Sequence, residues 1–204
     1  MLPALCAAQS PLPVERPHVR VGDLWTYQRM DYDAGKPRGR FELQVVFSDR
    51  GVIQVVGTGK SKDAEVDTTY TADWNAVSTA ARMFYPHTGW FKFPLQVGDR
   101  YKTAYESIIP AKNIKARNQR EVTVVGWEEV VVPAGKFRAL KIVSEGRFQR
   151  IETSSVSGLS RNVIWYVPAV KRWVKLTLEN RPGGAEGKAK GEYYGEELVE
   201  YKVQ

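Results

Sequence analysis

Side chains that could carry out acid–base or nucleophilic catalysis are few in this sequence. The two histidines, His18 and His87, lie in no recognisable catalytic signature, and no Gly-x-Ser-x-Gly elbow occurs. Glu128 and Glu129 are adjacent on a predicted strand and would point to opposite faces, so they could not act together on a glycosidic bond. The sequence therefore predicts no catalytic residue.

Metal and cofactor chemistry finds equally little support in the residue types. Cys6 is the only cysteine, which excludes an internal disulfide and a cysteine-based zinc site. Two isolated histidines are a poor set of transition-metal ligands, and the glycines around residues 183–195 do not form a phosphate-binding loop. We expect no metal and no cofactor.

Aromatic side chains are better candidates for binding. Trp90, Phe91 and Phe93 occupy both parities of one short segment, so they cannot all face the same side of a strand. They either fill the core from two sides, or some of them lie at a second apolar surface, such as a pocket or a partner site.

The chain is mildly basic, with a formal net charge of +7 and a pI near 9.4. Such a surface favours anionic partners. The densest basic run, residues 112–120, lacks the interleaved aromatic side chains with which single-strand nucleic-acid binders stack on bases. We expect no nucleic acid as a partner. The run is either a solvated loop or a peripheral contact with lipid headgroups or another anion.

Strands are the elements predicted to position these residues. Valine occurs 25 times and leucine 11 times, and β-branched side chains favour a pleated sheet. Residues 40–48, 172–179 and 199–203 alternate in polarity, as strands with one covered face do. In the second of these, Val174 is predicted to point inward and Trp173 to the opposite face. Short turn sequences separate the strands, which predicts an antiparallel meander.

One segment, Asn75–Tyr85, is predicted to be helical, because small and apolar side chains recur there at helical spacing behind Asp73, a suitable N-cap. The predicted fold is mainly β, a single curved antiparallel sheet or half-barrel with this one short helix. Residues 14–204 are predicted to be one domain. The phrase Val-Gly-Asp opens a predicted strand at residues 21–23 and again at 97–99, which indicates two similar strand entries or a duplicated half-domain.

Residues 1–13 are predicted to be the remnant of a signal peptide or a disordered tail. Residues 1–8 are apolar and rich in small side chains, with a suitable cleavage point after Ala8. A lipoprotein signal with Cys6 acylated is the alternative. We therefore expect a periplasmic or secreted protein.

Three phrases carry a resemblance to known proteins. They are FPLQVGDRY at residues 93–101, GWEEVVVPAGKFRALKI at 126–142 and WYVPAVKRWVK at 165–175. Together they resemble a group of exported bacterial β-rich proteins classed as domains of unknown function. The chain is more distantly similar to the LolA/LolB-type periplasmic lipoprotein carriers, whose curved antiparallel half-barrel holds lipid. The resemblance implies fold and compartment, and it supplies no catalytic residue.

These observations favour a non-enzymatic exported protein that binds a lipophilic or anionic ligand, or a protein partner, in the bacterial envelope. A structural subunit of an envelope assembly is one alternative, and a hydrolase whose carboxylates only the fold brings together is another. The ligand pocket is predicted under the predicted helix. Its predicted apolar lining is Trp74, Met83, Phe84, Trp90, Phe91 and Phe93. The predicted contacts to an anionic headgroup are Lys112, Lys115, Arg117 and Arg120.

Overall fold

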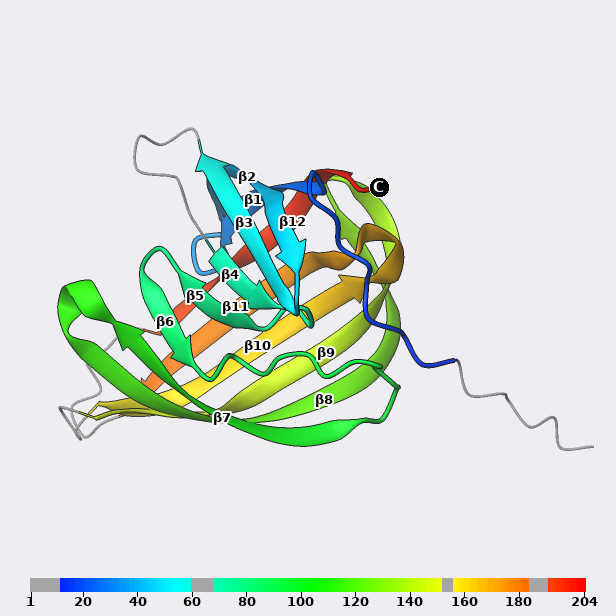
Figure 1. Ribbon diagram of the computed structural model, residues 1–204. Helices are drawn as coiled ribbons and strands as arrows, with labels where there is room; N and C mark the ends of the chain where they lie inside the picture. The colour runs from blue at the N-terminus through cyan, green and yellow to red at the C-terminus, as the bar shows by residue number, and fades with distance from the viewer. Residues whose placement is uncertain (1–11, 60–67, 152–155, 184–190) are drawn as a thin grey trace, which may run out of the picture.

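The computed structural model describes residues 12–59, 68–151, 156–183 and 191–204. In these residues the chain forms a closed antiparallel barrel of twelve strands, whose order around the barrel follows the chain (Figure 1). The strands are β1 (Leu24–Asp31), β2 (Lys36–Asp49), β3 (Val52–Gly59), β4 (Thr68–Thr71), β5 (Ala76–Thr79), β6 (Arg82–Tyr85), β7 (Arg100–Ile109), β8 (Ile114–Val132), β9 (Gly135–Arg150), β10 (Ser157–Val167), β11 (Arg172–Gly183) and β12 (Glu192–Lys202). Two single turns of 3-10 helix, η1 (Pro110–Lys112) and η2 (Pro168–Val170), follow β7 and β10.

The predicted half-barrel is wrong, because the sheet closes on itself. β1 pairs with β2 on one side and with β12 on the other, so that Leu24 lies opposite Lys202 and Asp31 lies opposite Tyr194. An alternating pattern of apolar and polar side chains is the same in an open curved sheet and in a closed barrel. The pattern therefore could not distinguish the two.

The predicted helix at Asn75–Tyr85 is also wrong. This segment forms β5 and β6, and the Thr79 hydroxyl accepts a hydrogen bond from the Arg82 backbone N–H at 3.1 Å in the turn between them. The Asn75 side chain holds the strand in place, because its amide donates to the Phe91 carbonyl at 2.8 Å and accepts from the Phe91 N–H at 2.9 Å. The described parts of the chain contain no α-helix, and so no helix there could span a membrane.

Side chains alternate between the inner and outer faces of the barrel along each strand. On β8, Val122 and Val124 are buried inside while Val125 is half exposed. The inner faces meet in one hydrophobic core, which is rich in aromatic rings in one half of the barrel. These rings belong to Trp25, Tyr27, Tyr70, Trp74, Phe91, Tyr166 and Trp173.

Trp173 lies in this core, opposite to the face predicted from strict alternation. It is 2% exposed, and Tyr166 is its partner on β10. The pairing of β10 with β11 shifts by one residue next to Tyr166, which adds Val174 to β11 as a bulge. A bulge reverses the alternation for the residues beyond it, so Trp173 turns inward.

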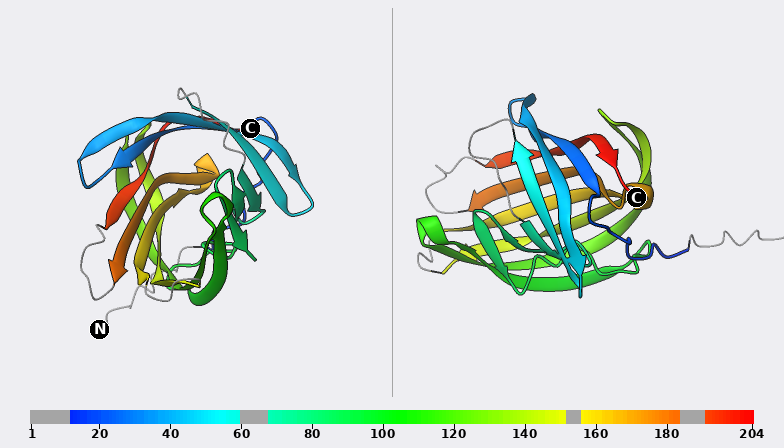
Figure 2. Two further views of the ribbon diagram at one scale, coloured as in Figure 1. Left: turned by 90° about the vertical axis from the view of Figure 1, so that its left-hand side faces the viewer. Right: turned by 45° about the horizontal axis from the view of Figure 1, so that its top comes forward.

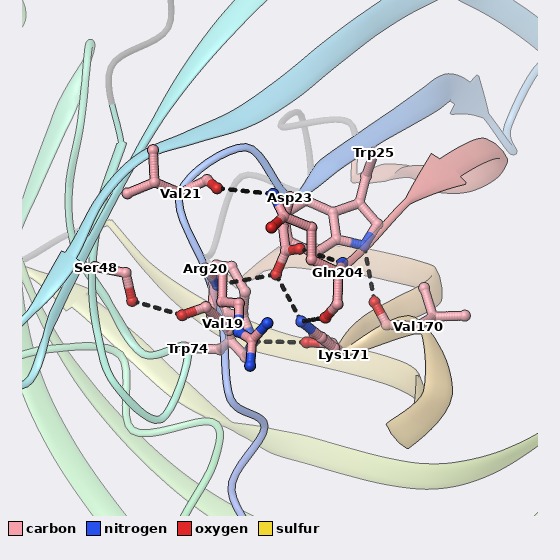
Figure 3. Close-up of polar contacts among 10 residues, drawn as sticks. All are labelled: Val19, Arg20, Val21, Asp23, Trp25, Ser48, Trp74, Val170, Lys171 and Gln204. Carbon is pink, nitrogen blue, oxygen red and sulfur yellow. Dashed lines mark hydrogen bonds and ion pairs between the residues drawn. The ribbon is translucent and has the colours of Figure 1, made fainter.

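A buried carboxylate holds one end of the barrel together (Figure 3). Asp23 is fully buried, and its carboxylate accepts hydrogen bonds from the backbone N–H groups of Arg20 at 2.9 Å and Gln204 at 2.8 Å. The Lys171 ammonium donates a hydrogen bond to the same carboxylate at 3.0 Å. The segment before β1, the residue after η2 and the segment after β12 are thereby joined, and we call this the closed end.

Two indole groups reinforce the closed end. Trp25 donates its N–H to the Val170 carbonyl at 2.9 Å, and Trp74 donates to the Lys171 carbonyl at 2.8 Å. Because the two indoles bind the last carbonyl of η2 and that of the residue after it, the turn lies fixed over the aromatic half of the core (Figure 3).

The repeated Val-Gly-Asp phrase forms the same strand-entry turn twice. In the first copy the Arg20 backbone N–H donates to the Asp23 carboxylate at 2.9 Å. In the second copy the Gln96 backbone N–H donates to the Asp99 carboxylate at the same distance. The glycine of each copy has a positive φ, 93° or 96°, and its N–H donates to a carbonyl of the next strand, that of Val45 or Val124. One turn begins β1 and the other begins β7.

Candidate ligand-binding site

The opposite end of the barrel is lined by polar side chains. It lies where β7 and β8 meet at η1 and where β9 and β11 end, and Figure 2 (left) looks at the barrel from this side. Here Tyr105 of β7 lies opposite Asn118 of β8, and both point inward. Arg120 follows two residues after Asn118 on the same inner face. We call this the mouth of the barrel.

A cavity of about 320 Å³ opens at the mouth. This volume lies at the lower end of the range for small-molecule sites. The lining residues are Arg82, Tyr105, Ser107, Ile109, Ile114, Ala116, Asn118, Arg120, Phe148, Arg150, Val156, Asn180, Pro182 and Glu192. Three arginines and one glutamate leave the lining positively charged.

Arg120 is the most deeply buried charge of this cavity, with 7% of the residue exposed. Its guanidinium donates to the Ser160 carbonyl at 3.0 Å and, at 3.5 Å, to the Tyr105 hydroxyl. Its Nε is buried without a hydrogen-bond partner, and no carboxylate among the described residues pairs with it. A buried cation that lacks a counter-ion favours binding of an anion, because the anion then offsets the cost of desolvation.

Neighbouring polar groups are held by the barrel wall itself. The Asn118 amide donates to the Ser107 hydroxyl at 3.2 Å and to the Ala116 carbonyl at 3.2 Å, which fixes its orientation. Ser144 lies further inside on β9, and its hydroxyl is buried without a partner. The inner surface therefore presents a fixed amide, an arginine and an unsatisfied hydroxyl in succession from the mouth inward.

The structure separates the four basic residues that the sequence grouped together. Arg120 points into the cavity, whereas Lys115 and Arg117 are exposed on the outer face of the same strand. Lys112 is exposed in η1 at the tip of the β7–β8 hairpin. Alternation along β8 causes the separation, because Arg120 has the opposite parity to Lys115 and Arg117.

The six predicted apolar residues do not come together around this cavity. Trp74 and Phe91 are buried in the aromatic core and both lie against Trp173, and the Phe93 ring stacks on Phe91 with centroids 5.9 Å apart. Trp90 is partly buried against the same core.

The other two apolar residues lie on β6, with opposite orientations. The Phe84 ring contacts the cavity residue Tyr105 edge-on, with centroids 5.9 Å apart. Met83 points outward and is 53% exposed. Of the six, only Phe84 has a ring contact with a cavity residue among those described.

Tyr105, Ser107 and Asn118 were missed by sequence reasoning. A signal was present for Asn118, because it shares the parity of Val122 and Val124, whose apolar side chains mark the inner face of β8. Tyr105 and Ser107 lie on a strand with little alternation in polarity, so nothing in the sequence placed them inside.

A second buried arginine, Arg172, lies in the aromatic half of the barrel. Its guanidinium carbon is 3.8 Å from the ring centre of Trp173 and 4.3 Å from that of Trp74. The rings of Tyr70, Trp25 and Tyr27 follow at 5.0, 5.5 and 6.0 Å. We call these five rings the aromatic cage.

The aromatic cage is neutral. Burial raises the pKa of the Tyr27 hydroxyl well above its ordinary value, although the nearby guanidinium opposes the shift. Arg172 donates to the Tyr70 hydroxyl at 2.9 Å, and it pairs with no carboxylate among the described residues. The negative faces of the rings therefore provide much of its stabilisation.

Comparison with known proteins supports the fold. A protein from Bacteroides fragilis NCTC 9343, provisionally described as an exported protein with a YmcC-like fold, matches 94% of this chain and 100% of its own, with a TM-score of 0.54 and 17% identity. A protein from Parabacteroides distasonis ATCC 8503, provisionally described as a lipoprotein, matches the same shares with a TM-score of 0.55 and 10% identity. No family model and no curated protein matches the chain.

At these identities the likeness shows the shared fold alone. The two neighbours are described as exported or as a lipoprotein, which is consistent with the predicted periplasmic or envelope location. It is also consistent with the resemblance to exported bacterial β-rich proteins, whereas the likeness to LolA/LolB-type carriers is not confirmed.

Proposed function

We propose that the protein is a non-enzymatic, exported binding protein of the bacterial envelope, and that the mouth of its barrel holds an amphipathic anion. Arg120 carries the proposal, because it is a buried cation with an unpartnered Nε, no carboxylate partner and a cavity in front of it. Arg120 and the Tyr105 hydroxyl would together bind a carboxylate or phosphate oxygen.

The remaining lining suits the apolar part of such a ligand. Ile109, Ile114, Phe148, Val156 and Pro182 line the cavity alongside the polar groups. Ligand sites commonly combine an apolar wall with a few fixed polar groups that set orientation. A ligand with a short acyl chain would place that chain against the apolar wall and its acidic group at Arg120.

Two observations support an exported location. Residues 1–8 have the composition of the end of a signal peptide, and the two structural neighbours are described as exported or as a lipoprotein. Carriers of amphipathic anions are needed in an aqueous envelope compartment, where such molecules are poorly soluble.

A pair of fluorescent probes tests the proposal, one a fatty acid and the other the alcohol of the same chain. We expect the acid to bind wild type at least tenfold more tightly than the alcohol, because only the acid offers Arg120 a negative charge. Arg120→Met should remove this preference. Its free energy of unfolding should change by less than about 1 kcal/mol, because the lost hydrogen bonds and the relieved desolvation roughly cancel.

Arg117→Met is the matched control. It removes the same charge from the same strand, but on the outer face, and it should retain the preference for the acid. Equal binding of acid and alcohol to wild type, or an unchanged preference in Arg120→Met, would contradict the proposal.

A further inference from the structure

The outer face of the barrel next to the mouth carries a row of arginines. Arg147 of β9 and Arg181 of β11 flank Leu159 of β10, with which both are paired in register. Arg117 of β8 lies one row nearer the mouth, opposite Gln149. We call Arg117, Arg147, Leu159 and Arg181 the arginine wall.

A groove runs over the arginine wall, with a volume of about 830 Å³. Its lining is Arg117, Gln119, Arg147, Phe148, Gln149, Ser157, Gly158, Leu159, Arg181, Pro182 and Gly183, which includes three arginines and no carboxylate.

The arginines of the wall differ in their partners. Arg117 pairs with Glu106 at 3.4 Å, and this pair is solvent-exposed and therefore weak. Arg181 contacts the half-buried Glu179 through two nitrogens, at 2.7 and 2.5 Å. Arg147 is exposed, and its side chain has no ion pair or hydrogen bond with the described residues. The groove thus has positive charge available to an external anion.

Apolar side chains are exposed beside the same groove. Leu159 is 54% exposed within it, and Ile151 at the end of β9 is 39% exposed. Met83 and Tyr85 on the outer face of β6 are 53% and 75% exposed. They lie outside the groove lining, and Glu106 of β7 separates Tyr85 from Arg117. Exposed aromatic and aliphatic side chains close to basic ones are typical of surfaces that lie at the boundary between headgroups and acyl chains.

We propose that the arginine wall docks on an anionic phospholipid surface. Arginine binds phosphate oxygens in a bidentate manner, and each basic residue close to an anionic bilayer contributes about 1 kcal/mol. Leu159, Met83 and Tyr85 enter the headgroup layer beside the arginines. Charge complementarity and the exposed apolar side chains together favour a bilayer over a soluble phosphate compound, which would use the arginines alone.

Docking on this face places the mouth of the barrel beside the bilayer. Phe148 and Pro182 belong to both the groove and the inner cavity, so the two sites share a wall. The docking face and the mouth therefore lie at the same end of the barrel, although the docking test below requires no ligand.

Vesicle co-sedimentation tests the proposal. Wild type should bind vesicles of phosphatidylglycerol and phosphatidylcholine, bind vesicles of phosphatidylcholine alone much less, and lose binding as salt screens the charges. The triple variant Arg117→Gln, Arg147→Gln, Arg181→Gln should partition about a hundredfold more weakly onto the anionic vesicles, at about fivefold per arginine.

The triple variant Arg40→Gln, Arg50→Gln, Arg100→Gln is the matched control, since it removes three exposed positive charges away from the wall. It should bind nearly as wild type does. Equal losses in the two triple variants would overturn the proposal by showing that net charge alone matters. Wild-type binding that is absent, or equal on neutral and anionic vesicles, would overturn it as well.

Discussion

Arg120 and Arg172 are both buried inside the barrel, and neither pairs with a carboxylate among the described residues, yet their surroundings differ. Five aromatic rings surround Arg172, and its unpartnered N–H groups lie among them. Arg120 has one tyrosine hydroxyl, one backbone carbonyl and an open cavity. The aromatic cage stabilises a cation with the protein's own groups, whereas the mouth leaves that stabilisation to a molecule from outside.

This difference indicates that the Arg172 charge has a structural role and that the Arg120 charge has a role in binding. Ring faces can balance part of the desolvation cost of a guanidinium, and they do so permanently. A cation at a cavity is balanced only when an anion enters, so its stabilisation depends on ligand concentration. The two arginines should therefore respond in opposite ways to the same substitution.

The largest effect is expected from Arg172→Met. The change removes the cation from the aromatic cage and leaves the Tyr70 hydroxyl without its donor, so the free energy of unfolding should fall by about 3 kcal/mol. Denaturant titration measures the loss. Binding of the fatty-acid probe to the folded variant should stay close to wild type, in contrast to Arg120→Met. An equally stable Arg172→Met variant would show that the cage contributes nothing.

An intermediate effect is expected from Gly146→Ala, in the wall behind Arg120. A Cβ at this position would lie 1.9 Å from the Gln119 carbonyl oxygen, so β8 and β9 would have to separate. We expect a loss of about 2 kcal/mol in the free energy of unfolding and weaker probe binding. Gly183→Ala is the control, because its Cβ would lie at an ordinary 3.6 Å from the Ser157 carbonyl oxygen. Unchanged probe binding in a destabilised Gly146→Ala variant would show that Arg120 is not part of the binding site.

The smallest effect concerns Glu196, a partly buried carboxylate on β12. Burial raises its pKa, although the Arg172 charge opposes the shift. Since the folded state then holds the proton more tightly than the unfolded state, wild type should lose stability relative to Glu196→Gln as the pH rises from about 4 to 7, by less than about 1 kcal/mol. Denaturant titrations at several pH values check the sign. The reverse trend would mean that Glu196 acts as the counter-ion of Arg172.

How far the sequence predicted the molecule depends on the type of interaction. Alternation in polarity over residues 40–48 predicts one shared face for Phe41, Leu43, Val45 and Phe47. The first three are buried as expected, because a period of two is a local property, whereas Phe47 is 42% exposed beyond a register shift after Val45. Alternation placed Trp173 outside, because a bulge is a property of the pairing between two strands and leaves no mark on one strand. Closure between β1 and β12 was missed for the same reason.

The candidate site shows the same limit. Arg120 was selected because it belongs to a basic run, but its separation from Lys115 and Arg117 follows from parity, which the sequence does contain. The cavity itself could not be predicted, since its lining comes from seven different strands or strand ends brought together only by the closed barrel. The arginine wall combines side chains of four neighbouring strands, β8 to β11.

The seam between β1 and β12 has a consequence for how the protein is made. Every other neighbouring pair of strands is joined by a short stretch of chain and can form as soon as it is synthesised, whereas residue 24 must wait for residue 202. Until then the growing sheet presents two unpaired edges, which invite pairing with other chains. An exported chain of this design needs to be kept from folding until its last strand has crossed the membrane, and the Asp23–Lys171–Gln204 contacts then fasten the seam only in the complete barrel.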